Sequence, residues 1–117
     1  MRAVVFTRPD TFELSDVPDP TPDANGVIVS VKATTICATD VKILHGTVPF
    51  VKFPHIPGHE WGGEIVEVGS NVKGLRKGDL VGVEAHVGCG KCERCLEGLY
   101  NLCENYGHPE TGHAHIG

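Results

Sequence analysis

The chain has 117 residues and a net charge of −5 at pH 7, with 40% hydrophobic and 21% charged residues. This length suits one compact domain, and the composition is that of an ordinary soluble protein rather than of a disordered one. The acidic charge argues against a nucleic-acid or anionic-membrane partner. The sequence has no apolar run long enough to cross a membrane and no secretory signal peptide, so we expect a cytoplasmic protein.

Hydrophobic patterning predicts several short β-strands and almost no helix. Residues 2–6 are typical of a short strand, and in 26–34 β-branched residues alternate between two faces. Further strands are expected at 61–68 and 79–84, each bounded by turn-forming residues. Several short strands at this spacing favour a β-barrel or a β-sandwich.

The remaining segments read as loops and one short helix. Four prolines between residues 9 and 22 remove backbone donors, so that stretch is expected to be a loop or an edge strand. Thr39 can cap the start of a helix and Gly46 can end it, which leaves room for at most two turns.

Cysteine spacing is the sharpest feature of the chain. Four of the five cysteines, Cys89, Cys92, Cys95 and Cys103, lie within fifteen residues, and an odd total without an export signal argues against a disulfide framework. Tetrahedral zinc takes four such thiolates from one short loop. Because all four ligands would come from the protein, no position would stay open for a substrate, and the site is expected to be structural.

An iron–sulfur cluster is the alternative for these cysteines, because bacterial ferredoxins also begin with this close spacing. Their fourth cysteine follows the third after three residues and precedes a proline, whereas here seven residues intervene and Glu104 follows Cys103. The spacing therefore favours zinc.

Two further segments carry residues suited to metal chemistry. One is Cys37-Ala-Thr39-Asp40, and the other is Gly58-His59-Glu60. Taken singly, Cys37 could be a small buried hydrophobic residue and the His–Glu pair a surface ion pair. The residue types alone leave both interpretations open.

Taken in order, these motifs resemble the zinc-containing medium-chain alcohol dehydrogenases, in particular the sorbitol and threonine dehydrogenase branch. The resemblance runs from residue 2 to about 106 and includes the Gly-Asp-Leu-Val run at 78–81. It implies a mainly β fold, a GroES-like irregular β-barrel with a short helix and a zinc-binding loop, residues 86–106, called here the cysteine lobe. Residues 1–117 would then be the catalytic domain of a longer protein, because the sequence contains no dinucleotide-binding glycine motif.

The resemblance also implies roles for individual residues. Cys37 and His59 would bind a catalytic zinc, and Glu60 would be either its third protein ligand or a carboxylate close by. Asp40 would accept the other ring N–H of His59, and Thr39 would relay the proton of the substrate alcohol. NAD or NADP would bind through the domain that this chain lacks.

The function implied is an oxidoreductase that converts an alcohol, a polyol or a hydroxy amino acid to the carbonyl. The full-length protein would be a homo-oligomer, and this chain alone would be inactive. A non-enzymatic zinc-binding interaction module is the main alternative, and a co-chaperonin-like subunit is a third. Neither alternative needs a second metal site at Cys37 and His59.

Some positions depart from the family pattern or stay unassigned. Several relatives carry a relay histidine where this chain has Lys42, and His45 is a possible substitute. Trp61 either lines a substrate pocket or packs in the core, whereas Phe50 and Phe53 are interpreted as packing residues. His108, His113 and His115 form a histidine-rich stretch that is expected to be a solvated loop.

Overall fold

The computed structural model describes residues 1–106, and strands outnumber helices among them. In chain order the elements are β1 (Arg2–Arg8), β2 (Thr11–Asp16), β3 (Val27–Thr34), α1 (Ala38–Leu44), β4 (Trp61–Val68), β5 (Leu80–Gly82), α2 (Glu93–Leu96) and the 3-10 helix η1 (Tyr100–Leu102). The predicted mainly β fold is confirmed. No helix within residues 1–106 has the length and apolar character that a membrane crossing requires.

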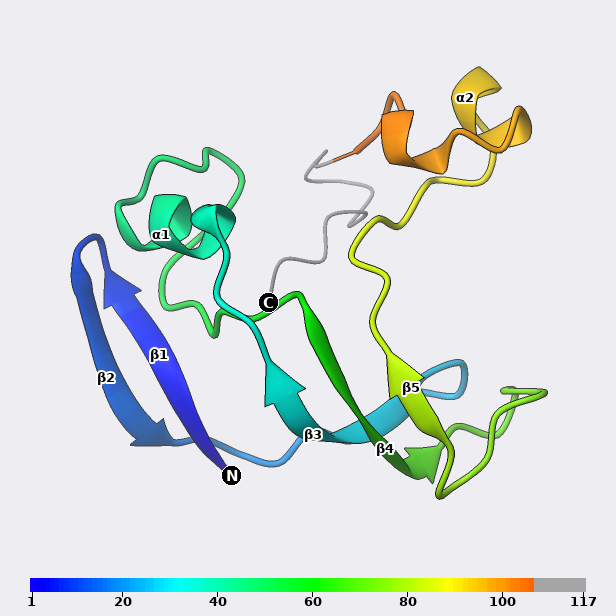
Figure 1. Cartoon of the computed structure of the whole chain (residues 1–117), viewed down its shortest axis with the longest axis horizontal. Coiled ribbons are helices and arrows are strands. Elements are labelled where there is room, and N and C mark those ends of the chain that lie inside the picture. The colour runs from blue at the N-terminus through cyan, green and yellow to red at the C-terminus, as the bar shows by residue number, and fades with distance from the viewer. Residues whose placement is uncertain (107–117) are drawn as a thin grey trace.

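The strands form two antiparallel sheets (Figure 1). β1 and β2 make a hairpin, and β3, β4 and β5 make a three-stranded sheet with β4 in the centre. β5 pairs with β4 over only three residues, Gly62–Glu64, and the two sheets do not join into a closed barrel within residues 1–106. The barrel expected from the sequence is therefore present here as two open sheets.

The pairing of β3 with β4 positions the segments that carry the predicted site. Val31 lies opposite Gly63 and Thr34 lies opposite Trp61, with irregularities in the register between them and near Ile28. A side chain on Gly63 would overlap the Ser30 carbonyl of β3, so the close approach of the two strands requires glycine there.

The N-cap of the helix lies two residues earlier than the sequence indicates. Cys37, not Thr39, is the N-cap residue of α1, and its Sγ accepts the backbone N–H of Thr39 at 3.3 Å. In return, Asp40 Oδ2 accepts the backbone N–H of Cys37 at 2.8 Å, which completes a capping box. The predicted end is confirmed, because Gly46 follows the helix with φ +69°.

The hydrophobic core is small and packs against α1. Phe6 of β1 and the fully buried Ile43 of α1 form its centre, and partly buried side chains including Phe53 surround them. Phe53 is therefore a packing residue as predicted, but Phe50 is 42% exposed and its assignment to packing was wrong. Phe50 lies in the irregular segment between α1 and β4.

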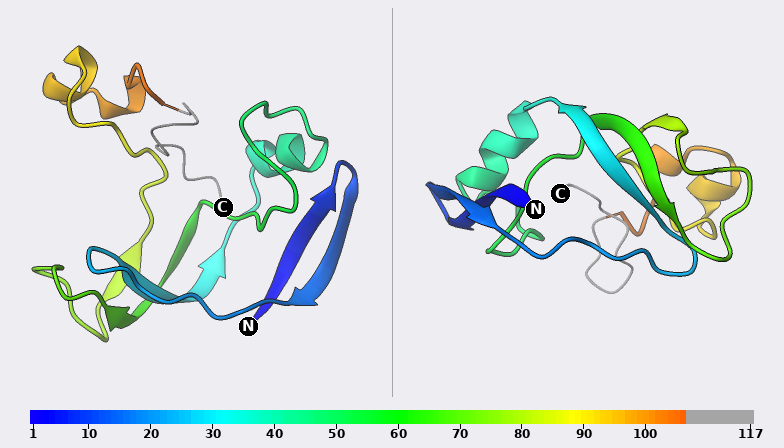
Figure 2. Two further views of the ribbon diagram at one scale, coloured as in Figure 1. Left: turned by 180° about the vertical axis from the view of Figure 1, so that it is seen from behind. Right: turned by 90° about the horizontal axis from the view of Figure 1, so that it is seen from below.

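The stretch interpreted as loop or edge strand contains β2, which lies between Pro9 and Pro18 as an edge strand of a two-stranded sheet, in agreement with the second alternative. The cysteine lobe contains two short helical turns, α2 and η1, that no periodicity predicted. Figure 2 shows this lobe beyond the end of β5, joined to the sheet by an extended segment.

Candidate metal centres

The four cysteines of the lobe converge on one point. Their sulfur atoms all lie within 4.8 Å of one another, with 4.0 Å between Cys89 and Cys95 and 3.9 Å between Cys92 and Cys103. Four sulfurs at about 2.3 Å from a tetrahedral zinc ion are separated by about 3.8 Å. The sulfur arrangement therefore fits a tetrahedral zinc ion.

Backbone donors around the lobe favour the thiolate form that a metal needs. The N–H of Lys91 and the amide of Asn105 lower the pKa of the Cys89 thiol to about 5, and the N–H of Cys95 lowers the pKa of Cys92. Burial raises the pKa of Cys95 to about 12. Because the four sulfurs repel one another as anions, a divalent cation among them is what allows all four to ionise.

Close packing fixes the start of this loop. A side chain on Gly88 would lie 2.7 Å from Cys95 Sγ and 2.8 Å from Tyr100 Cβ, so glycine is required at that position. Gly90 has φ +70°, which allows the chain to turn between Cys89 and Cys92.

A second cluster joins the two other motifs. Cys37 Sγ lies 3.3 Å from Nε2 of His59, and ligand atoms of Cys37, Asp40 and His59 all lie within 4.8 Å of one another. A sulfur and a ring nitrogen bound to one tetrahedral zinc ion are about 3.6 Å apart. The pair Cys37 and His59 can therefore bind one metal ion together.

Asp40 and His59 are both buried, at 5% and 8% exposure. Asp40 Oδ1 faces His59 Nδ1 at 3.4 Å, and neither atom has a hydrogen-bond partner within the described residues. A metal-binding histidine commonly donates its second ring N–H to a carboxylate, which fixes the ring and raises its basicity. With Nδ1 toward Asp40 and Nε2 toward Cys37, the ring is oriented for that arrangement.

Glu60 and Thr39 do not belong to the cluster that these three residues form. Glu60 lies outside the Cys37, Asp40 and His59 cluster, is exposed, and accepts the Thr35 hydroxyl on Oε2 at 2.5 Å. Thr39 is the second residue of α1, and its backbone N–H rather than its side chain contacts Cys37 Sγ. The structure thus brings Cys37, Asp40 and His59 together and leaves Glu60 beside them.

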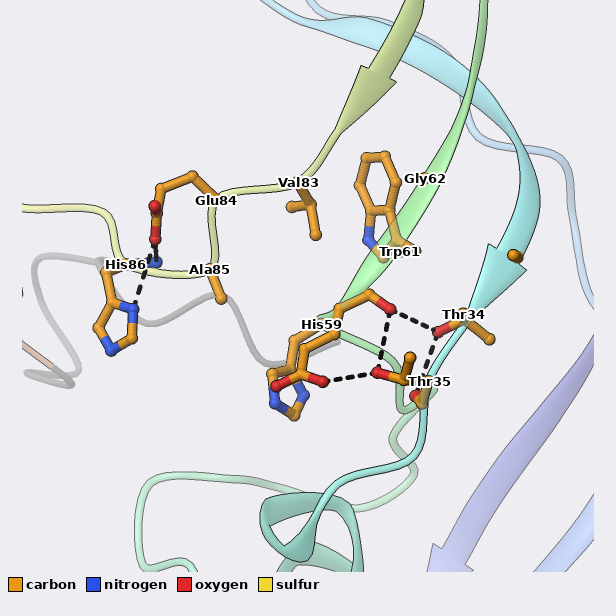
Figure 3. A pocket seen from close by; sticks show the side chains of 11 residues that line it. Thr34, Thr35, His59, Trp61, Gly62, Val83, Glu84, Ala85 and His86 are labelled. Atoms are coloured by element: carbon orange, nitrogen blue, oxygen red, sulfur yellow. Dashed lines mark hydrogen bonds and ion pairs between the residues drawn. The ribbon is translucent and has the colours of Figure 1, made fainter.

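An open pocket of about 550 Å³ adjoins this second cluster (Figure 3). Its lining residues come from the end of β3, the start of β4 and the segment after β5. They are Ala33, Thr34, Thr35, His59, Glu60, Trp61, Gly62, Val83, Glu84, Ala85 and His86. Trp61 is half-buried, lines this pocket and lies outside the core cluster around Phe6 and Ile43.

The other histidines take different places. His45 ends α1 and pairs with Asp10 of the β1–β2 turn, so it does not join the second cluster. His86 lines the pocket, faces Glu84 at 3.4 Å and stacks on Tyr106 with ring centroids 5.6 Å apart. The stretch with His108, His113 and His115 lies outside the described residues.

Sequence reasoning missed Thr34, Thr35 and Glu84 as site residues. Thr35 stands two positions before Cys37, and the register of β3 with β4 brings it to Glu60. One metal motif closely follows the first strand of this pair, and the other directly precedes the second strand. That arrangement in the sequence could have predicted the contact.

Comparison with known proteins identifies the family of the chain. The family described as "Alcohol dehydrogenase GroES-like domain" matches residues 23–116. The chain belongs to that family. It is 48% identical over 109 residues to the L-threonine 3-dehydrogenase of Cutibacterium acnes, covering 90% of this chain and 32% of that protein.

Solved structures agree with this membership. The cobalt- and zinc-bound thermostable alcohol dehydrogenase from Pyrobaculum aerophilum superposes with a TM-score of 0.84 and 35% identity, covering 92% of this chain and 33% of that one. A zinc-binding dehydrogenase from Sinorhizobium meliloti bound to NADP gives 0.81 and 35%, covering 89% and 30%. The chain spans about a third of the length of these relatives.

We expect Cys95→Ser to remove zinc from the cysteine lobe and to lower the melting temperature of the chain. A closed four-thiolate site couples metal binding to folding, so the loss of one ligand weakens both. Zinc content by elemental mass spectrometry and thermal melting with and without a chelator check this. Unchanged zinc content and unchanged melting would contradict the assignment.

We expect Asp40→Asn to weaken metal binding at the Cys37 and His59 pair by about 10- to 100-fold, because no carboxylate would then face Nδ1 of His59 to accept its N–H when the metal is bound. Asp10→Asn is the matched control, since Asp10 also pairs with a histidine but lies outside the cluster. Competition titration with cobalt measures both affinities. Equal affinities in the two variants would show that Asp40 does not support the site.

Proposed function

We propose that this chain is the catalytic-zinc domain of a zinc-dependent, NAD(P)-linked dehydrogenase. The observation that carries the proposal is the 3.3 Å approach of Cys37 Sγ to His59 Nε2 beside an open pocket. One thiolate and one imidazole leave positions on a metal ion free for a substrate, unlike the closed four-cysteine lobe. The reaction would oxidise the hydroxyl of a small alcohol, polyol or hydroxy amino acid to a carbonyl.

Each side chain of the second cluster has a part in this proposal. Cys37 and His59 would hold the zinc ion, and Asp40 would accept the Nδ1–H of His59. When bound, the zinc ion would act as a Lewis acid that makes the substrate hydroxyl more acidic. Thr39, at the start of α1 next to Cys37, would take the hydroxyl proton toward solvent.

The pocket lining favours a substrate with a cationic group. Glu60 and Glu84 both line it, and both residues are exposed. An ammonium group next to the reacting hydroxyl would be attracted by these charges. Within the proposed class, this supports a hydroxy amino acid, and the relatives named L-threonine 3-dehydrogenase support the same choice.

The nicotinamide cofactor would bind through parts of the protein outside this chain. The relatives are about three times as long as this chain, and one of the solved relatives is described as bound to NADP. We therefore propose that the 117-residue chain alone does not oxidise alcohols. We further propose that the full-length protein is a cytoplasmic homo-oligomer.

The second cluster favours the enzyme over a zinc-binding interaction module. Such a module would need the cysteine lobe alone, and it would have no use for a buried Asp40–His59 pair that faces Cys37. A co-chaperonin-like subunit would need neither metal cluster.

The test uses the full-length protein that carries this chain, with L-threonine, sorbitol and ethanol as substrates and NAD⁺ or NADP⁺ as acceptor. We expect the highest kcat/KM with L-threonine. His59→Gln should lower it by at least about 100-fold, because a Lewis acid supplies several kcal/mol of stabilisation in the transition state. His45→Gln, a histidine at the far end of α1, is the control that should retain activity. Zinc-loaded protein that oxidises none of these alcohols would contradict the proposal.

A further inference from the structure

The first and last residues of the cysteine lobe stack on one another. The rings of His86 and Tyr106 have centroids 5.6 Å apart, and their planes are inclined by 25°. His86 comes three residues before Cys89, and Tyr106 comes three residues after Cys103. The ring pair therefore joins the two ends of the lobe, on either side of the four-sulfur cluster.

The turn that carries Tyr106 is bonded to that sulfur cluster. The Tyr106 N–H donates to the Cys103 carbonyl at 3.1 Å. The neighbouring Asn105 donates its backbone N–H to Cys103 Sγ at 3.4 Å and its side-chain amide to Cys89 Sγ at 3.3 Å. Because these bonds tie residues 103–106 to two of the four sulfurs, the position of the Tyr106 ring depends on an ordered lobe.

His86 belongs to the pocket as well as to the lobe. It lines the pocket together with Glu84 (Figure 3), whose Oε1 accepts the His86 backbone N–H at 3.0 Å and lies 3.4 Å from ring atom Nδ1. The His86 side chain is 50% exposed. One contact to a single ring atom does not fix the plane of an exposed ring, whereas stacking on a second ring does.

We propose that Tyr106 is a positioning residue that holds the His86 ring on the wall of the pocket, so that the cysteine lobe helps to shape the substrate site. This inference rests on the proposed function, in which the pocket receives the substrate. A side chain that is already ordered loses little further freedom on binding, so an ordered wall binds the substrate more tightly. The closed four-cysteine site would thereby contribute to substrate binding through a pair of rings.

The test is the kinetics of the full-length protein with whichever of L-threonine, sorbitol and ethanol it oxidises best. Tyr106→Ala should raise KM about 3- to 10-fold, the loss expected when one side chain must be ordered on binding. The kcat should change little, because His86 lies outside the cluster of Cys37, Asp40 and His59. Tyr106→Phe keeps the ring and should restore KM.

Two further variants separate positioning from a general weakening of the lobe. Tyr100→Ala removes the other tyrosine of the chain but keeps the Cβ atom that lies close to Gly88, and it should leave KM unchanged. In a His86→Ala background, Tyr106→Ala should raise KM no further, because Tyr106 then has no ring to hold. Zinc content by elemental mass spectrometry should be equal in all of these variants.

The position of the ring is also measured without activity, by NMR of the full-length protein labelled at the Cε1 atoms of its histidines. The His86 signal is the one that is missing from His86→Ala. A neighbouring aromatic ring shifts this resonance, so the signal should move in Tyr106→Ala and stay in place in Tyr100→Ala.

An unchanged KM in Tyr106→Ala, or an increase that persists in the His86→Ala background, would overturn the inference and leave the proposed function intact. An unmoved His86 signal or a loss of zinc in Tyr106→Ala would overturn it as well, the latter by showing a structural role. If the unmodified, zinc-loaded protein oxidises none of the three alcohols, the proposed function is wrong and the inference fails with it, whatever the NMR signal shows.

Discussion

The pairing of β3 with β4 is the constraint on which the second metal cluster depends. Cys37 comes three residues after the end of β3, and His59 comes two residues before the start of β4. Because Thr34 lies opposite Trp61 in an antiparallel register, the two flanking segments leave the sheet side by side. The Thr35 N–H bond to the Glu60 carbonyl continues this ladder one step beyond the strands. A residue larger than glycine at position 63 would push the strands apart and separate the two ligands.

Asp40 connects this sheet-built site to the helix. One carboxylate oxygen accepts the Cys37 N–H and helps to start α1, while the other faces His59. The same side chain therefore sets the backbone conformation of one metal-binding residue and the ring orientation of the other. Ile43, one helical turn further on, packs against Phe6 and anchors α1 to β1. The ligand geometry thus rests on core packing as well as on local hydrogen bonds.

The two clusters differ in what the sequence could predict. Four cysteines close in sequence are constrained by their own spacing, so the convergence of the lobe could be predicted without knowledge of the fold. Cys37 and His59 are 22 residues apart, and only their resemblance to a family motif linked them. The bond between Thr35 and Glu60 depends on strand register, which local patterning does not fix. That is why Glu60 was left with two possible roles.

Local errors in the predicted fold have similar causes. Thr39 has the side chain that usually caps a helix, but the extended backbone of Cys37 and the reach of Asp40 move the cap two residues earlier. The strand predicted at 79–84 shortens to Leu80–Gly82, because β4 offers it only three pairing residues. The alternation at 26–34 predicted its strand correctly, and β3 pairs with β4 from Val27 to Thr34.

The most direct test is the zinc stoichiometry of the 117-residue chain. It is measured by elemental mass spectrometry after equilibrium dialysis against a small excess of zinc. We predict about two zinc ions per chain, and about one per chain for Cys37→Ser, because the lobe and the second cluster share no residue. One zinc ion per chain in both proteins would contradict it, since Cys37 and His59 would then hold no metal.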